Sequence, residues 1–359
     1  MKKIVFSLSL IAILIGCTRQ MPEQPVVGET KLNLPSTPYE YSYVTTDNGQ
    51  EPVLYEDGSV IDNKKATIGR VLFYDKALSF NNSTACASCH IQEYGFSDVS
   101  QFSVGFEGLP TKRNSMPISN LYNTRKVGYF WDTRETKIES MVFAPIQDHI
   151  EMGFTRIDVI TEKIGNLKYY QKLFKDAYGD ETITTDRMRE SLGQFLFSIV
   201  NKNSKFDKGI KSGFSNFEQN EMRGMELFVE LECDKCHFLH EDFSYEGSKR
   251  ERFANIGLDA QDKDKGKDGQ YRIPDLRNIS KTAPYMHDGR FKTLSEVINH
   301  YGFGVQNNDH LSDELKNRPP AHNFDSYSGG KKADILAFLR TLDDQSSLHD
   351  PKFSSPFEK

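Results

Sequence analysis

The apolar positions of this chain recur at helical spacing in two long segments. Between Asp186 and Val200 they lie three and four residues apart, and the pattern returns from Ala333 to Leu342, which we interpret as the final helix. Such spacing gives a helix one apolar face. Asn216 followed by Gln219 indicates a capping box at the start of another helix. Glycine and proline turns, such as residues 105–110, mark loops rather than strands. The patterning predicts a mainly α-helical fold with long loops.

The first residues have the pattern of an export signal. Two lysines precede an apolar run at residues 4–15, which is too short to span a bilayer and suits a signal peptide. Because small and apolar residues directly precede Cys17, we predict a lipoprotein signal peptide at residues 1–16 and lipidation of Cys17. The alternative is an ordinary signal peptide followed by a stray cysteine. Residues 17–50 suit a tether, and we expect a lipid-anchored protein of the cell envelope, on the periplasmic side.

The charge balance narrows the choice of partners. Acidic residues outnumber basic ones by 51 to 45, and removal of residues 1–16 would take away two lysines and no acid. Nucleic acids and anionic membrane surfaces attract clustered Lys and Arg. The composition therefore argues against a nucleic acid partner and leaves a basic protein partner open. Past residue 16, no apolar stretch approaches membrane-spanning length, so a membrane contact would depend on the lipid anchor alone.

Four of the five cysteines form two copies of one motif, Cys86-Ala87-Ser88-Cys89-His90 and Cys233-Asp234-Lys235-Cys236-His237. Two thiols at this spacing can add to the two vinyl groups of one haem, and the adjacent histidine then reaches the iron. A zinc ribbon would bring its two cysteine pairs within roughly 20 residues of each other, and a thioredoxin-like pair would need a strand–helix–strand setting. Neither condition is met. Each motif is predicted to hold one covalent haem c, with His90 and His237 as proximal ligands.

A weak internal repeat surrounds the two motifs. Residues 69–73 (Gly-Arg-Val-Leu-Phe) precede the first motif as residues 224–228 (Gly-Met-Glu-Leu-Phe) precede the second, and residues 131–134 match residues 287–290 at an offset of 156. This pattern predicts two class I cytochrome c-like haem domains related by duplication. The expected units are the domains at residues 51–205 and 206–345 and a tail at residues 346–359.

The same offset pairs Pro145 with Tyr301. If the helix that begins near Thr293 crosses the second haem, Tyr301 would place a phenolate on its iron, with His300 as the rival ligand. Proline offers no side-chain donor at the equivalent position over the first haem. The repeat therefore predicts one closed and one open haem.

These residues resemble the bacterial dihaem cytochrome c peroxidases and the related MauG-type enzymes of methylamine utilisation, across almost the whole mature chain. Besides the two haem motifs, the resemblance rests on Arg113-Asn114, Phe130-Trp131-Asp132, Glu151-Met152-Gly153, Leu276-Arg277-Asn278 and residues 282–289 (Thr-Ala-Pro-Tyr-Met-His-Asp-Gly).

The resemblance implies a role for several anchors. Glu151 would be the acid–base group over a peroxide-reactive first haem, and Trp131 would carry electrons or holes between the first haem and an electron-transfer second haem. The Asn114 side chain and the backbone carbonyls of Thr282 and Pro284 would hold a calcium ion between the domains, since oxygen ligands suit this hard cation.

Three positions depart from the family pattern. Phe106 stands where peroxidases have a loop histidine that blocks the first haem, and Met141 stands where both groups have a distal glutamine. Tyr301 stands at the methionine ligand of the peroxidases, as in the MauG type, and a phenolate would lower the potential of the second iron. Trp131 is the only tryptophan, so a surface tryptophan relay of the MauG kind is absent, a role that tyrosines could take.

The sequence therefore predicts a dihaem c-type peroxidase that reduces hydrogen peroxide to water at the first haem. Electrons would pass through the second haem from a small cytochrome c, a cupredoxin or a quinol-linked carrier. Two alternatives stay open: a MauG-like, peroxide-dependent oxidase of a partner protein or organic substrate, and a dihaem electron-transfer cytochrome without peroxide chemistry. An open first haem argues against the second alternative.

Overall fold

The computed structural model describes residues 31–46, 49–124, 127–239, 253–259, 267–316 and 330–358. These residues form a mainly helical fold with two short antiparallel strand pairs, which confirms the predicted fold class in its coarse form. Cys17 and the predicted signal peptide lie outside the described ranges. None of the described helices is long and apolar enough to cross a membrane.

The chain forms these elements in order. The helices are α1 Asn63–Tyr74, α2 Ile138–Met141, α3 Ala144–Gln147, α4 Ile157–Gly165, α5 Lys168–Tyr178, α6 Thr185–Phe197, α7 Lys205–Ile210, α8 Gln219–Glu230, α9 Cys233–Cys236, α10 Leu294–Asn299, α11 Asp313–Lys316, α12 Lys331–Thr341 and α13 Gln345–His349. The strands are β1 Tyr43–Thr46, β2 Gly49–Pro52, β3 Phe253–Ala254 and β4 Tyr271–Arg272, paired β1 with β2 and β3 with β4. Short helical turns are η1 Lys76–Leu78, η2 Cys86–Ser88, η3 Gln92–Tyr94, η4 Leu121–Thr124, η6 Lys267–Gly269, the π-helical turn η7 His300–Gly304 and η10 Pro351–Phe353.

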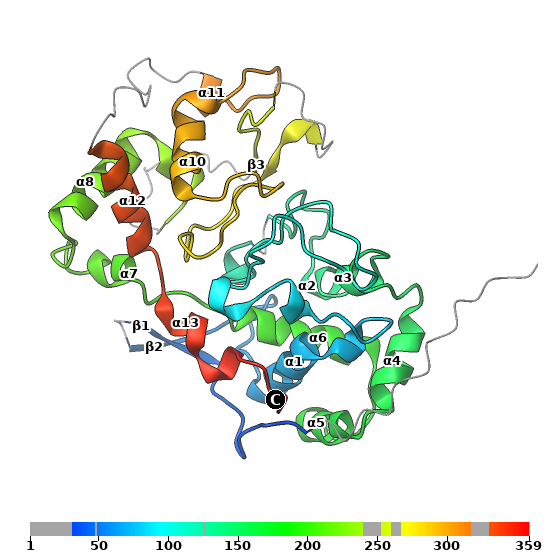
Figure 1. The fold of residues 1–359 in the computed structure, drawn as a ribbon. Coiled ribbons are helices and arrows are strands. Elements are labelled where there is room, and N and C mark those ends of the chain that lie inside the picture. Colours follow the sequence, from blue (N-terminus) through cyan, green and yellow to red (C-terminus); the bar gives the residue numbers. More distant parts are fainter. Residues whose placement is uncertain are drawn as a thin grey trace, which may run out of the picture.

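The first half of the molecule is built on the packing of α1 against α6, in the lower lobe of Figure 1. A Cβ atom at Gly69 would lie 1.9 Å from the carbonyl oxygen of Ser191, so the two helices approach this closely only because residue 69 is glycine. Phe73 packs on Phe195, with ring centroids 5.4 Å apart. The apolar spacing predicted between Asp186 and Val200 thus corresponds to the buried face of α6.

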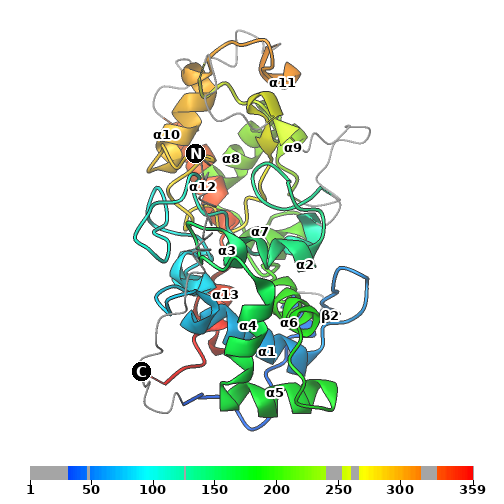
Figure 2. The same cartoon turned by 90° about the vertical axis from the view of Figure 1, so that its right-hand side faces the viewer.

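The second half repeats this arrangement with α8 and α12, in the upper lobe of Figures 1 and 2. A Cβ atom at Gly224 would lie 2.0 Å from the carbonyl oxygen of Asp334 on α12. The aromatic ring of Phe338 contacts that of Phe228 at 5.3 Å. The first core extends to Val200 and the second begins at Phe206.

Both ends of the described chain pack against the first core, which corrects the predicted tether and tail. Tyr41 is fully buried, and its hydroxyl donates to the carbonyl oxygen of Lys352 at 3.0 Å. Phe353 is also buried, and Arg70 Nε donates to the carbonyl oxygen of Ser354 at 2.6 Å. Large aromatic side chains in both segments bury against α1 and α6, so residues 31–46 and 346–358 belong to the folded body.

Two predictions of helix ends were wrong. The capping box of α8 is formed by Glu218 and Glu221, whereas the side chain of Asn216 donates to the carbonyl oxygen of Lys205 at 2.9 Å. Helix α12 is not the last one, because α13 follows it. The predicted start near Thr293 is confirmed, since Thr293 caps α10.

Two loops with matching geometry lie where the halves meet. Tyr129 N–H donates to the carbonyl of Glu135, and Tyr285 N–H donates to that of Phe291, each at 2.7 Å. The second pair lies at the repeat offset from the first.

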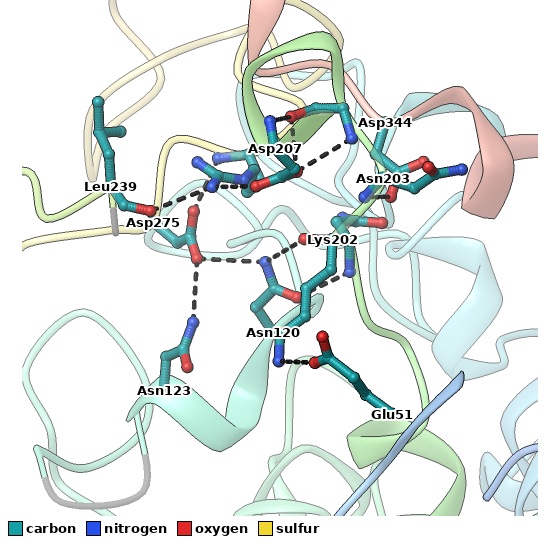
Figure 3. A network of polar contacts seen from close by, with 12 residues as sticks. Glu51, Asn120, Asn123, Lys202, Asn203, Asp207, Leu239, Asp275 and Asp344 are labelled. Carbon is teal, nitrogen blue, oxygen red and sulfur yellow. Dashed lines mark hydrogen bonds and ion pairs between the residues drawn. The ribbon is translucent and has the colours of Figure 1, made fainter. Parts of the chain in front are cut away.

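Polar contacts also hold the halves together: the Asp275 carboxylate accepts hydrogen bonds from Asn120 at 3.2 Å and from Asn123 at 3.4 Å (Figure 3).

Candidate active site

The first haem motif lies beside a cavity of about 530 Å³, which Cys86, Cys89 and His90 all line. The motif forms one tight turn, in which His90 N–H donates to the carbonyl of Cys86 at 2.9 Å. His90 Nδ1 lies 3.0 Å from the carbonyl oxygen of Phe96, which fixes the ring and leaves Nε2 available as a ligand. Burial lowers the pKa of His90, so the imidazole stays neutral, as iron ligation requires.

The rest of the cavity fits a haem. Much of its wall is apolar, formed by Phe73, Ile118, Leu121, Leu192 and Leu196. Arg272 reaches this wall from the second half with only 7% of its surface exposed. Its guanidinium donates to Met116 Sδ at 3.4 Å and to the carbonyl of Phe130 at 3.3 Å, and no described carboxylate forms a salt bridge with it. Burial lowers the pKa of Arg272 to about 10. A buried cation of this kind suits the carboxylate groups of a haem.

Glu151 places a half-buried carboxyl group in the same cavity. Burial raises the pKa of Glu151 to about 7, and the charge of Asp148 adds to the shift. Asp148 also shapes the loop, because its Oδ1 accepts hydrogen bonds from the N–H groups of Ile150 at 2.7 Å and Glu151 at 3.1 Å. A Cβ atom at Gly105 would lie 1.8 Å from the carbonyl oxygen of Ile150, so a glycine is needed beside this loop.

Several other residues line the cavity or pack beside it. Met141 and Pro145 both line it, in agreement with their predicted place near the first haem. His149 also lines the cavity and is exposed. Phe106 is buried, and a Cβ atom at Gly153 would lie 2.3 Å from its ring. The ring of Phe106 therefore packs on the loop that carries Glu151.

Trp131 forms part of the cavity wall where the two halves meet. Its indole Nε1 donates to the carbonyl oxygen of Asn114 at 2.9 Å, and its own carbonyl accepts from Arg272 N–H at 2.8 Å. The tryptophan is thus held by one residue from each half. Sequence reasoning found Trp131 but missed Arg272, because the contact joins residues that are far apart in the chain.

The second haem motif forms helix α9, and His237 N–H donates to the carbonyl of Cys233 at 2.8 Å. His237 Nδ1 lies 3.3 Å from the carbonyl oxygen of Pro274, and burial lowers the pKa of His237. Tyr301 is half-buried in the π-helical turn η7. The rival His300 is buried, with Nε2 2.8 Å from the carbonyl oxygen of Ile256. That contact occupies one of the two ring nitrogens of His300.

The three expected calcium ligands lie close to the boundary between the halves. Asn114 N–H donates to the carbonyl of His287 at 2.8 Å, and its side-chain nitrogen donates to the carbonyls of Ser100 at 3.3 Å and Gln101 at 3.2 Å. The hydroxyl of Thr282 donates to the carbonyl of Ile279, and Pro284 lines a second cavity together with Gln101. No cluster of three or more His, Cys, Asp or Glu side chains in the described ranges could hold a metal, so a calcium site would depend on amide and carbonyl oxygens.

The two haem motifs and the first cavity are typical of a c-type haem protein with a carboxyl group near the expected haem site. A family profile described as di-haem cytochrome c peroxidase matches residues 63–213. The chain is therefore similar to the dihaem cytochrome c peroxidase and MauG family, as the resemblance predicted, and its relatives support an oxidoreductase of the peroxidase type. The family implies two c-type haems, hydrogen peroxide as substrate and electron donors such as cytochromes.

The relatives include both MauG proteins and cytochrome c peroxidases. The chain is 29% identical to the methylamine utilization protein MauG of Methylorubrum extorquens over 298 residues, which is 81% of this chain and 82% of the relative. It is 26% identical to the cytochrome c551 peroxidase of Nitrosomonas europaea over 287 residues, 77% of this chain and 79% of the relative. Among solved structures, a MauG-like protein associated with microbial copper homeostasis aligns with a TM-score of 0.71 at 29% identity, over 85% of this chain and 97% of that one.

Proposed function

We propose that this protein reduces hydrogen peroxide to water at the first haem, with Glu151 as the acid–base group. The observation that carries the proposal is the half-buried carboxyl group of Glu151 in the cavity that His90 and both cysteines of the first motif also line. A haem bound there supplies the iron on which peroxide is cleaved. An acid–base group works best when its pKa lies near the working pH, and burial brings the pKa of Glu151 to about 7.

The protein's own residues would perform three tasks in this reaction. Glu151 would take the proton from the near oxygen of peroxide and return it to the leaving oxygen. His90, fixed through Nδ1, would ligate the iron of the haem. Arg272 would bind a carboxylate of the haem and so position the group between the two halves.

Electrons would reach the first site through the second haem and Trp131. Support comes from the place of Trp131 at the meeting point of the halves, held by Asn114 and Arg272. Tyr301 would ligate the second iron and lower its potential, as phenolate ligation favours the oxidised metal. The donor would be a small cytochrome c, a cupredoxin or a quinol-linked carrier.

We also propose the remaining features that the sequence predicts. The two halves would be class I cytochrome c-like domains that arose by duplication, meeting near residue 205. The matching glycine crossings at Gly69 and Gly224 and the matching loops around Trp131 and His287 support this origin. A calcium ion would lie at Asn114, Thr282 and Pro284, and lipidation at Cys17 would hold the protein in the cell envelope, on the periplasmic side.

A second candidate function is a MauG-like oxidation of a partner protein or an organic substrate. The observation that favours it is the identity of residue 301, because a tyrosinate-ligated iron of low potential is a poor acceptor from ordinary cytochromes. The two candidates share the peroxide step and differ in what is oxidised afterwards.

The test is electron paramagnetic resonance and optical absorption of the oxidised protein, before and after one equivalent of peroxide. We expect one high-spin and one low-spin haem and a rapid spectral change. Two low-spin haems that ignore peroxide, before and after partial reduction, would contradict the proposal and leave an electron carrier. Oxidation of cytochrome c or of a small phenol by peroxide then separates the peroxidase from a modifier of one partner protein.

A further inference from the structure

Tyr129 is a buried tyrosine in the wall of the first cavity that the reaction above does not use. Its ring lines the cavity together with Cys86, His90 and Trp131, and only 2% of its surface is exposed. Its hydroxyl donates a hydrogen bond of 2.8 Å to Glu56 Oε1. The phenol therefore has the cavity on one side and a carboxylate on the other.

Glu56 is part of a carboxyl pair that leads away from the cavity. Both of its carboxylate oxygens lie 3.2 Å from the backbone nitrogen of Ile138, and the carboxyl group of Glu139 is its neighbour. Glu139 in turn accepts a hydrogen bond of 3.1 Å from the hydroxyl of Tyr55. Burial and the neighbouring Glu139 raise the pKa of Glu56, so Glu56 holds a proton more tightly than an isolated carboxylate would. Both acids are only half-buried, and protons can exchange with solvent there.

The phenol of Tyr129 does not ionise by itself in this setting. Burial and the hydrogen bond to Glu56 raise its pKa, with only Arg272 acting in the opposite direction. Loss of an electron changes this balance, because an oxidised phenol is a strong acid and transfers its proton to a hydrogen-bonded base. A carboxylate at 2.8 Å is such a base.

The equivalent tyrosine of the second half provides a natural comparison. Tyr285 lies at the repeat offset from Tyr129, forms the same loop contact and is also buried, with 8% exposed. Its hydroxyl donates instead to the carbonyl oxygen of Ile279 at 2.9 Å. A peptide carbonyl accepts a hydrogen bond but does not take up the proton. Of the two repeat-related tyrosines, only Tyr129 donates to a carboxylate.

We propose that Tyr129 is a redox-active residue that stores one oxidising equivalent of the peroxide reaction. One electron passes from the phenol to the oxidised first haem, and the phenolic proton passes to Glu56, which leaves a neutral tyrosyl radical on Tyr129. An electron from an external reductant, with the proton returned from Glu56, restores the phenol. The inference rests on the proposed peroxide reaction at the first haem.

The test uses the full-length holoprotein, mixed with one equivalent of peroxide without reductant and frozen within milliseconds to seconds. Electron paramagnetic resonance should detect an organic radical whose lines narrow when ring-deuterated tyrosine is incorporated. We expect Tyr129→Phe to lose this signal and the matched control Tyr285→Phe to keep it. Glu56→Gln keeps a hydrogen-bond acceptor but removes the base, so the radical should form more slowly and with a smaller yield. Haem absorption spectra verify that each variant is folded and carries two haems.

Several outcomes would overturn the inference. They are a haem that reacts with peroxide without any tyrosyl radical, an unchanged radical in Tyr129→Phe, and loss of the radical in Tyr285→Phe but not in Tyr129→Phe. If Tyr129→Phe does not fold, an unchanged rate and yield of radical formation in Glu56→Gln would also overturn the inference. A wild-type haem spectrum that does not respond to peroxide at all would instead refute the proposed function, and this inference with it.

Discussion

The two halves of the molecule share a scaffold and differ in the few side chains placed on it. Each half packs two helices across a glycine, each haem motif forms one tight turn, and each proximal histidine points Nδ1 at a backbone carbonyl. The cavity of the first half contains the half-buried carboxyl group of Glu151, and the repeat offset pairs Pro145 at that cavity with Tyr301 in the second half. In the proposed function, one haem-binding scaffold serves both catalysis and electron transfer, because the chemistry depends on the residues around the iron.

The difference between the two halves is tested most directly by removing the carboxylate of Glu151. We expect Glu151→Gln to lower the rate constant for reaction with peroxide by about 10²- to 10⁴-fold, since general acid–base catalysis contributes that much. Stopped-flow absorption of the haem measures this rate. Glu162→Gln, an exposed change on α4, is the control and should react like the wild type. A fall of less than about threefold in Glu151→Gln would mean that another group moves the proton.

The shared scaffold itself can be tested at the two glycine crossings. Gly69→Ala and Gly224→Ala should each lower the free energy of unfolding by about 1–3 kcal/mol or more, because the new Cβ meets a carbonyl oxygen of the partner helix. Denaturant titration followed by circular dichroism gives the values. Gly165→Ala on α4 is the control, since a Cβ there meets nothing within 4 Å. If only one of the two substitutions destabilised the protein, the proposed equivalence of the helix pairs would be weakened.

Substitution of Tyr301 tests which side chain ligates the second iron. Tyr301→Phe removes the only oxygen donor of this side chain, so we expect a new high-spin signal in electron paramagnetic resonance and a higher reduction potential for one haem. His300→Gln should leave both properties unchanged, because His300 is engaged with the carbonyl of Ile256. The reverse result would identify His300 as the ligand.

The smallest expected effect concerns the pH dependence of the first site. The base form of Glu151 must be deprotonated, so the rate constant for the peroxide reaction should rise with pH up to the pKa of about 7 and then level off. Asp148→Asn keeps the hydrogen bonds to the loop but removes a negative charge that raises this pKa. The inflection should therefore move to lower pH by roughly one unit or less. A shift to higher pH would contradict the assignment.

The sequence by itself determined the features that are encoded locally. The haem motifs need a fixed short spacing, and helix α6 and the cap of α10 follow from residues within one or two helical turns. The repeat offset also predicted which positions would match in the two halves. These features were accessible because the spacing, periodicity and capping are properties of neighbouring residues.

Only the tertiary structure decided which distant residues meet at the first cavity. Arg272 comes from the second half, and Glu56 reaches Tyr129 from before α1, so neither contact leaves a pattern in the sequence. The same holds for both chain ends. The sequence pattern of these segments is compatible with a tether and a tail, and only the structure shows that their aromatic side chains are buried against α1 and α6. Burial also sets the pKa of Glu151, because the cost of a charge depends on what surrounds it in space rather than on its neighbours in the chain.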